Sequence, residues 1–158
     1  MTIRDSDTVS DAKDYIEKHL KEGARCPCCR QLCKLYKRRI HSTMAKWLIW
    51  LVYEFEQRRD WIDVRETPVR GGDYAKLAYW RLIRNQIDYN RRKKLAPGRT
   101  GLWAPTSNGI AFAHGLIEVP KYAHVFNQEP CKYSKAEVSI VDCLGTDFDF
   151  QALWEGNW

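Results

Sequence analysis

The sequence has no long apolar run, and the longest, Trp47–Tyr53, is far too short to cross a bilayer. Its first ten residues carry Asp5 and Asp7, where a secretory signal would be basic and then apolar. These absences predict a cytoplasmic protein with no membrane partner. In that compartment the six cysteines are expected to be thiols or metal ligands and not disulfides.

The signatures of common catalytic sites are also missing. The four histidines show no His-x-x-x-His or His-x-Glu spacing, and there is no Gly-rich phosphate loop and no nucleophile elbow. Ser107 and His114 are separated by about two helical turns, too far for a nucleophile and its base. A group of aspartates at 142, 147 and 149 could hold a divalent ion, but an acidic tail is the plainer interpretation. We therefore expect a protein that is not an enzyme.

What the sequence does have is a folding composition and an excess of positive charge. Of 158 residues 44% are hydrophobic and 13% aromatic, and the formal net charge is +6. Such a balance favours polyanionic partners. The cations lie in two blocks, Arg25–Arg39 and Arg81–Arg99, whereas the chain from Ala136 onward carries five acidic residues and no basic ones.

Periodicity and capping residues predict four helices. They are Thr8–Glu22 with Ser10 as N-cap, Thr43–Gln57 with Ser42 as N-cap, Asp73–Arg84, and Ser107–His114 with Thr106 as N-cap. Strands are predicted at Leu32–Ile40, Trp61–Val64, Ile87–Tyr89, Leu102–Trp103 and Leu116–Phe126, with a basic loop at Arg91–Gly101 and a last apolar segment at Val138–Leu144. Cys131, Cys143 and four tryptophans are expected in the core, the latter being Trp47, Trp50, Trp80 and Trp103.

The order helix, helix, strand, basic loop, strand, helix is that of a winged-helix core. Residues 77–83 read Leu-x-x-Trp-x-Leu-Ile, and residues 103–109 read Trp-x-x-Thr-x-x-Gly. This pattern resembles the stretch of MarR-like and PadR-like repressors in which the recognition helix ends, the wing follows, and a Thr-x-x-Gly turn starts the next helix. In physical terms Thr106 can cap free backbone NH groups, and Gly109 allows its helix to pack closely.

A second resemblance spans most of the chain. Its segments are Cys-Pro-x-Cys at 26–29, Lys-Leu-Tyr-Lys-Arg at 34–38, Ser-Thr-Met-Ala at 42–45, Gly-Gly-Asp-Tyr-Ala-Lys-Leu-x-Tyr-Trp at 71–80 and Val-Pro-Lys-Tyr at 119–122. Together they resemble uncharacterised proteins of tailed bacteriophages and prophages. This resemblance implies a viral origin, and with it the host-cell cytoplasm, but it assigns no role to any residue.

The predicted fold class is therefore α+β, with a winged-helix core at 42–116. An N-terminal helix and a small Cys-rich basic knuckle at 1–41 precede the core. A C-terminal strand and an acidic aromatic tail at 117–158 follow it, and the three parts form one compact unit.

The cysteines of the first block have the spacing of a zinc knuckle. A Cys-Pro-x-Cys turn directs two thiolates, here Cys26 and Cys29, at one tetrahedral ion. The usual knuckle has Gly after the second Cys, where this chain has Arg30. Cys33 and His41 are the predicted remaining ligands of one structural zinc. The other interpretation is a reduced, metal-free turn.

The basic blocks predict a nucleic-acid interface. Base contacts would fall to the exposed face of the third helix, and phosphate contacts to the wing and the first block. The predicted residues are Lys76, Tyr79, Arg81 and Arg84 on the helix, Arg91, Arg92, Lys93, Lys94 and Arg99 in the wing, and Lys37, Arg38 and Arg39 in the first block. The alternative interpretation is that these basic residues form a solvated face with no binding role.

Two functions follow from these features. The first is a phage-encoded winged-helix regulator or accessory protein that binds duplex DNA. The alternative is a phage protein that binds and inhibits a host protein, with the winged helix as scaffold. The aromatic tail, with Trp154 and Trp158, could dock on its own domain, on a second copy in a homodimer, or on that host protein.

Overall fold

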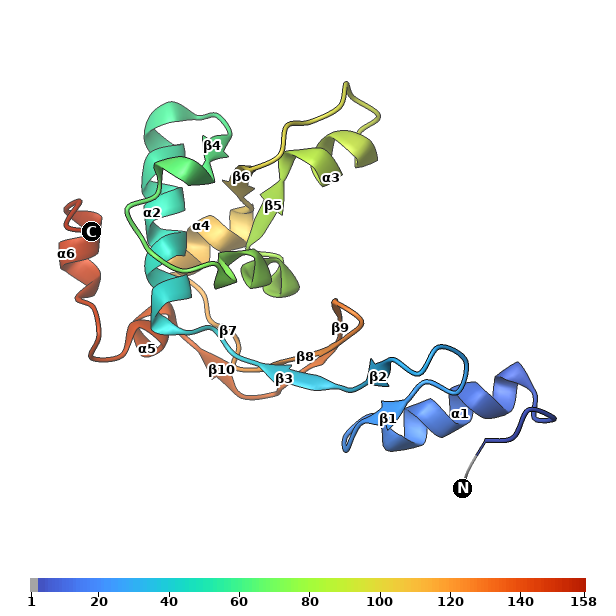
Figure 1. Ribbon diagram of the computed structural model, residues 1–158. Coiled ribbons are helices and arrows are strands. Elements are labelled where there is room, and N and C mark those ends of the chain that lie inside the picture. Colours follow the sequence, from blue (N-terminus) through green and yellow to red (C-terminus); the bar gives the residue numbers. More distant parts are fainter. Residues whose placement is uncertain (1–2) are drawn as a thin grey trace.

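One long helix, α2 (Ser42–Arg58), packs against most of the other helices and small sheets, whereas the N-terminal helix and the two-stranded sheet after it lie apart from α2 (Figure 1). The computed structural model describes residues 3–158. Met1 and Thr2, which belong to the predicted N-terminal unit, lie outside the described residues. The predicted α+β class is confirmed, with sheets of only two or three strands.

The other helices are α1 (Val9–His19), α3 (Gln86–Arg92), α4 (Ser107–Ala113), α5 (Ile140–Leu144) and α6 (Phe150–Trp154), with the 3₁₀ helices η1 (Val64–Glu66) and η2 (Asp73–Trp80). The strands are β1 (Ala24–Arg25), β2 (Leu32–Cys33), β3 (Tyr36–Arg38), β4 (Ile62–Asp63), β5 (Ile83–Asn85), β6 (Leu102–Pro105), β7 (Val119–Pro120), β8 (Ala123–Phe126), β9 (Glu129–Tyr133) and β10 (Glu137–Val138). They form the sheets β1–β2, β10–β7, β3–β8–β9 and β4–β6–β5.

Helix α2 is central because its sequence is apolar on most sides. Eight of its residues between Met44 and Val52 are buried, and Trp47 and Trp50 are among the largest fully buried side chains. Strand β6 and helices α4, α5 and α6 pack around it. Trp80 is also buried as predicted, whereas Trp103 is half-buried at the edge of the core.

The Thr-x-x-Gly turn joins α4 to the segment before β5. The Thr106 hydroxyl donates to the Arg81 carbonyl at 2.6 Å and accepts from the Gly109 NH at 3.0 Å. A Cβ on Gly109 would lie 1.9 Å from the carbonyl oxygen of Leu82. Both predicted roles are therefore confirmed: Thr106 caps α4, and Gly109 lets α4 approach the neighbouring backbone.

Two predicted N-caps were wrong. Helix α1 is capped by Thr8 and not by Ser10, because Thr8 and Asp11 form a reciprocal capping box. Ser42 is the first residue of α2 and not its cap, and its hydroxyl donates to Asp147 at 2.6 Å. Ser42 therefore ties the start of α2 to the C-terminal segment.

The predicted third helix, Asp73–Arg84, is instead the short 3₁₀ helix η2. It ends where Arg81 adopts a left-handed conformation, with φ of 57°. The strand predicted at Ile87–Tyr89 was also wrong, because the strand comes earlier, at β5, and α3 follows it directly. Asn85 explains that switch, since its side-chain oxygen accepts from the Asp88 NH at 2.7 Å and caps α3.

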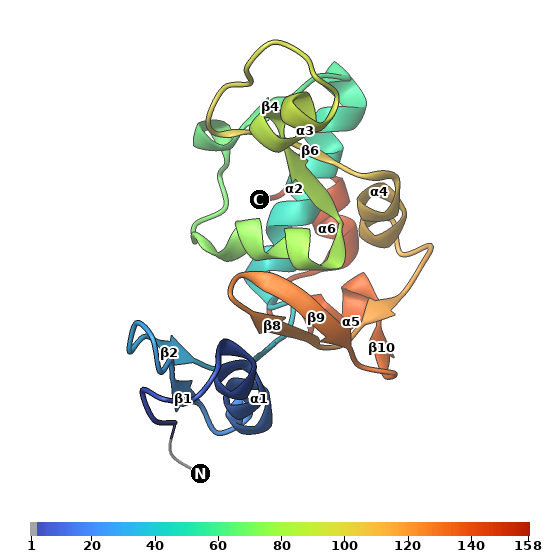
Figure 2. The same ribbon diagram turned by 90° about the vertical axis from the view of Figure 1, so that its right-hand side faces the viewer.

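Two other predicted strands are divided. Residues 32–40 split into β2, which pairs with β1, and β3, which pairs with β8. Residues 116–126 split into β7 and β8, and β8 continues into β9, which was not predicted. The hairpin of β8 and β9 lies beside η2 (Figures 1 and 2).

Candidate nucleic-acid interface and cysteine turn

A cleft of about 700 Å³ lies between η2, β5, α3 and the first residues of β9. Its lining includes four cations, two carboxylates and two half-buried aromatic residues. They are Arg81, Arg84, Arg92 and Lys93, Asp88 and Glu129, and Tyr89 and Trp103. We call this the basic cleft. It gathers four of the predicted nucleic-acid residues, from three elements, around one opening.

Arg84 is held at the rim of the cleft by aromatic rings. Its guanidinium carbon lies 4.6 Å from the centre of the Tyr89 ring and 5.9 Å from that of Trp61. These rings pack edge-on against each other, with centroids 5.4 Å apart. A cation over an aromatic face keeps its NH groups free at its edge. Arg84 is thus oriented and still exposed.

Asp88 is engaged within α3 and leaves most of the cleft cations unneutralised. The Asn85 amide donates to one of its carboxylate oxygens at 2.9 Å, and Arg91 lies 3.7 Å from the other. Arg91 is therefore beside Asp88 and outside the cleft lining. The net charge of the lining side chains is positive.

The loop after α3 is fixed by contacts with the start of that helix. The backbone NH of Arg99 donates to the Gln86 side chain at 2.7 Å, and a Cβ on Gly98 would meet the Gln86 backbone at 2.7 Å. The Arg99 side chain lies near Asp63, and its charge helps to hold the pKa of that carboxyl at about 2, after the larger effect of the Arg65 hydrogen bonds. Lys94, in a left-handed conformation, is exposed.

The remaining predicted contact residues lie elsewhere. Lys76 pairs with Asp73 at 2.7 Å, and the Tyr79 carbonyl accepts from the Tyr133 hydroxyl. Lys37 and Arg38 are on β3, over the rings of Tyr122 and Tyr36 respectively, and Arg39 lines a second cleft of about 380 Å³ together with Asp142 and Asp147. The structure therefore brings four residues of the predicted set to the basic cleft and leaves the other eight outside its lining.

The cysteine turn is closed by two backbone hydrogen bonds. It connects β1 to β2, with the Cys26 NH donating to the Gln31 carbonyl at 2.8 Å and the Arg30 NH to the Cys26 carbonyl at 2.9 Å. Arg30 has a φ of 63°, the left-handed conformation that favours glycine. Arg30 thus adopts, at some steric cost, the conformation for which the usual knuckle has Gly.

Three of the predicted ligands are neighbours. Backbone NH groups of Cys29 and Cys28 hydrogen-bond the Cys26 sulfur and lower the pKa of that thiol. Burial raises the pKa of Cys33, and nearby Cys26 and Cys29 raise it further. Within residues 3–158, no group of three or more His, Cys, Asp or Glu side chains has the arrangement of a metal site.

His41, the fourth predicted ligand, is not brought to this turn. It is the residue before α2, where its charge acts on Asp73, and the extended β3 separates it from the turn (Figure 1).

The other two cysteines differ from each other. Burial raises the pKa of Cys143 to about 11, but Cys131 is exposed, so its predicted burial was wrong. Cys131 lies on β9, the edge strand of its sheet, where every residue except Pro130 is exposed.

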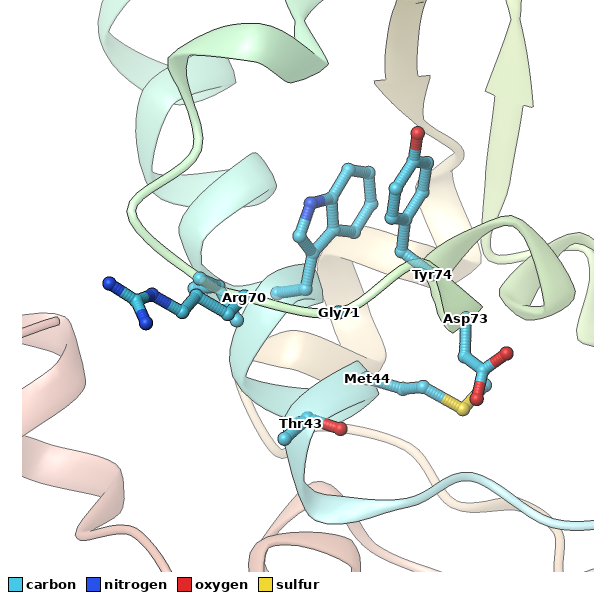
Figure 3. Close-up of a pocket in the computed structure, with 8 residues that line it drawn as sticks. Thr43, Met44, Arg70, Gly71, Asp73 and Tyr74 are labelled. Carbon is cyan, nitrogen blue, oxygen red and sulfur yellow. The ribbon is translucent and has the colours of Figure 1, made fainter.

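A small cavity of about 40 Å³ lies between the start of α2 and the loop before η2 (Figure 3). Tyr74 closes it by stacking on Trp47, with ring centroids 4.4 Å apart, while Arg70 points away. A space of this size holds a water molecule or two and no larger ligand.

The aromatic tail docks on its own domain. The Trp154 ring stacks on His114 at a centroid distance of 4.2 Å, and its indole NH donates to the Ala113 carbonyl at 3.3 Å. Trp158 packs edge-on against Tyr53 of α2 at 5.5 Å. The sequence left three docking surfaces open for the tail: its own domain, a second copy and a host protein. The structure places both rings on the chain's own domain.

The rings of Tyr89 and Trp61 and the contribution of β9 were not predicted from the sequence. Tyr89 lies five residues after Arg84, in a segment expected to form a strand, and Trp61 lies 23 residues before Arg84, so no helical spacing indicated these contacts. The chain matches no protein-family model, and no match was found among curated proteins or solved structures. Among the helices of residues 3–158, none has the length and apolar character needed to cross a membrane.

Proposed function

We propose that this protein binds duplex DNA through the basic cleft, as a regulator or accessory factor of the winged-helix kind. The observation that carries the proposal is the convergence of Arg81, Arg84, Arg92 and Lys93 on one cleft. Cations grouped on one face neutralise phosphates and release counterions, which supplies most of the affinity of non-specific DNA binding.

The sheet topology supports the winged-helix part of the proposal. In β4–β6–β5 the middle strand pairs antiparallel with both neighbours, and β5 and β6 are joined by a long basic connection in the place of a wing. The element before β5, where a recognition helix would stand, is the short η2, and its Lys76 is paired with Asp73. We therefore assign the main contact to β5 and α3, and so to phosphates more than to base edges.

The test measures binding of a short duplex by fluorescence anisotropy at low and moderate salt. The wild-type chain should bind at low salt, with affinity falling steeply as salt rises. Arg84→Glu/Arg92→Glu/Lys93→Glu should weaken binding at least about 100-fold, because three attractions become repulsions. A matched triple reversal of exposed cations outside the cleft, Arg4→Glu/Lys13→Glu/Arg70→Glu, should have a much smaller effect.

Failure of the wild-type chain to bind duplex DNA at low salt would overturn the proposal. Equal loss in the two triple variants would do the same, because it would show that net charge and not the cleft determines binding. In either case inhibition of a host protein becomes the leading function, although the internal docking of Trp154 and Trp158 leaves that alternative without its predicted anchors.

We also propose that the cysteine turn holds one structural zinc ion. The Cys-Pro-x-Cys spacing and the hydrogen-bonded turn that carries Cys26 and Cys29 support it, while the described residues contain no preformed group of three ligands. Zinc would join β1 to β2 and add folding energy to a module whose two strands are only two residues long. The fourth ligand is not assigned, because His41 lies at the start of α2.

Chain purified without chelator should contain about one zinc per molecule by elemental analysis. Cys26→Ser should lower both the zinc content and the melting temperature, whereas Cys131→Ser, an exposed cysteine outside the turn, should change neither. A zinc-free protein in which the two variants melt alike would show that the turn is a metal-free hairpin.

A further inference from the structure

A row of basic residues crosses the β3–β8–β9 sheet. Lys37 of β3 is directly opposite His124 of β8, and His124 is directly opposite Lys132 of β9. We call these three residues the cation row. Neighbouring strands are about 4.8 Å apart, so the row spans roughly 10 Å.

The cation row faces away from the core. Ala123 and Val125, the neighbours of His124 along β8, are buried in the hydrophobic core, so His124 lies on the opposite face of the strand. Lys37 and Lys132 are exposed. The bulge of β9 also separates Lys132 from Pro130, which pairs with Val125 and lines the basic cleft. The row is therefore a surface distinct from the cleft.

Like charges placed directly opposite each other in a sheet are destabilising. Among residues 3–158, the charged groups that act on His124 are Lys132, Lys37 and Lys21, which follows α1, and all are cations. After burial, these charges are what lowers the pKa of His124. Lys37 is further held over the Tyr122 ring, 4.0 Å from its centre. An anion of high charge density placed against the row would relieve this repulsion.

We propose that the cation row is a second contact for a nucleic-acid phosphate backbone, on the outer face of the sheet. The inference rests on the proposed function for the choice of partner: a DNA strand carries one charge about every 3.4 Å along its axis, dense enough to engage all three side chains. Bound phosphate favours protonated His124 and so raises its pKa, which means that binding takes up a proton and strengthens as the pH falls through the bound-state pKa.

The experiment uses the full chain, a short duplex and two readouts. Lys37→Gln/Lys132→Gln should weaken binding about tenfold at low salt and reduce the salt slope by about 1.8, because two phosphate contacts are lost. Its melting temperature should equal or exceed that of the wild type, since cross-strand repulsion is removed. The matched control, Lys13→Gln/Arg70→Gln, removes two exposed cations elsewhere and should bind as the wild type does.

The second readout is the NMR titration of the His124 ring, assigned with His124→Gln. Its pKa should lie below 6.5 in the free chain and rise when duplex is added, while His114, paired with Glu56, serves as an internal reference.

A row variant that binds like its control, together with an unmoved His124 titration, would overturn the inference even if the cleft variant fails to bind. A row variant that loses binding while the cleft variant does not would uphold it and overturn the cleft. A wild-type chain that does not bind duplex overturns both.

Discussion

Replacing Gly109 with alanine is expected to lower the free energy of unfolding by about 3 kcal/mol or more, which would lower the melting temperature by roughly 10 °C. The new Cβ would lie 1.9 Å from the Leu82 carbonyl oxygen and 2.9 Å from its carbonyl carbon. These are backbone atoms of a fully buried residue, so no side-chain rotation relieves the overlap. Either α4 or the segment that leads into β5 must move.

The same carbonyl accepts from the Thr106 NH at 3.0 Å, so a shift of α4 also breaks the turn that begins the helix. Gly72→Ala is the matched control. Gly72 has a φ of −101°, and a Cβ there would meet nothing within 4 Å. That variant should be neutral or stabilising by up to about 1 kcal/mol, through the entropy of the unfolded chain. Thermal unfolding followed by circular dichroism measures the melting temperatures of both variants. Equal melting temperatures would contradict the close approach of α4 to the Leu82 backbone.

Local capping chemistry explains which elements the sequence predicts well. Helix α4 was predicted with its N-cap because Thr106 stands at a clear boundary between a strand and an apolar helix. Helix α2 was predicted within one residue at each end because its apolar run is long. In both, local and tertiary preferences agree, which is the condition under which periodicity is informative.

The region between residues 73 and 92 shows where sequence reasoning fails. Apolar spacing at 73–84 suits an α-helix, but tertiary packing selects the tighter η2 and ends it at Arg81, a residue with no turn signal. The true start of α3 was marked by Asn85 followed by Asp88, a capping pattern that begins just after the expected helix and runs into the expected strand. A short element has too few residues for its periodicity to outweigh its contacts.

The sequence predicted which residues belong to the candidate sites better than it predicted how they are arranged in space. The basic residues of the cleft were named from the sequence, but the wall that Glu129 and Pro130 of the unpredicted β9 contribute was not. The cation row could not have been found, because it requires the register between β3, β8 and β9. Pairing between strands 87 residues apart along the chain leaves no local signal.

The second large effect is expected for Trp154→Ala, a loss of about 2–3 kcal/mol in the free energy of unfolding. Fully buried Trp→Ala changes cost roughly 3–5 kcal/mol, and Trp154 is half-buried. The variant removes the stack on His114 at 4.2 Å and the hydrogen bond to Ala113. It also exposes the contact between His114 and Glu56, whose Nε2–Oε1 distance is 2.6 Å. Helix α6 should then detach from α2, although the buried Leu153 still holds part of it.

Trp154→Phe distinguishes the contribution of the ring stack from that of the hydrogen bond, because it keeps a ring over His114 and loses the NH donor. It should lower the free energy of unfolding by about 1 kcal/mol. Leu116→Ala, at a side chain that is 77% exposed, is the control for loss of apolar surface and should be near neutral. Urea unfolding of the three variants gives the comparison. If Trp154 bound a host protein and did not hold α6 against the rest of the fold, Trp154→Ala would unfold at the same urea concentration as the wild type. A clear loss of stability means that the ring is already used within the fold, and an inhibitor of a host protein would then need another contact surface.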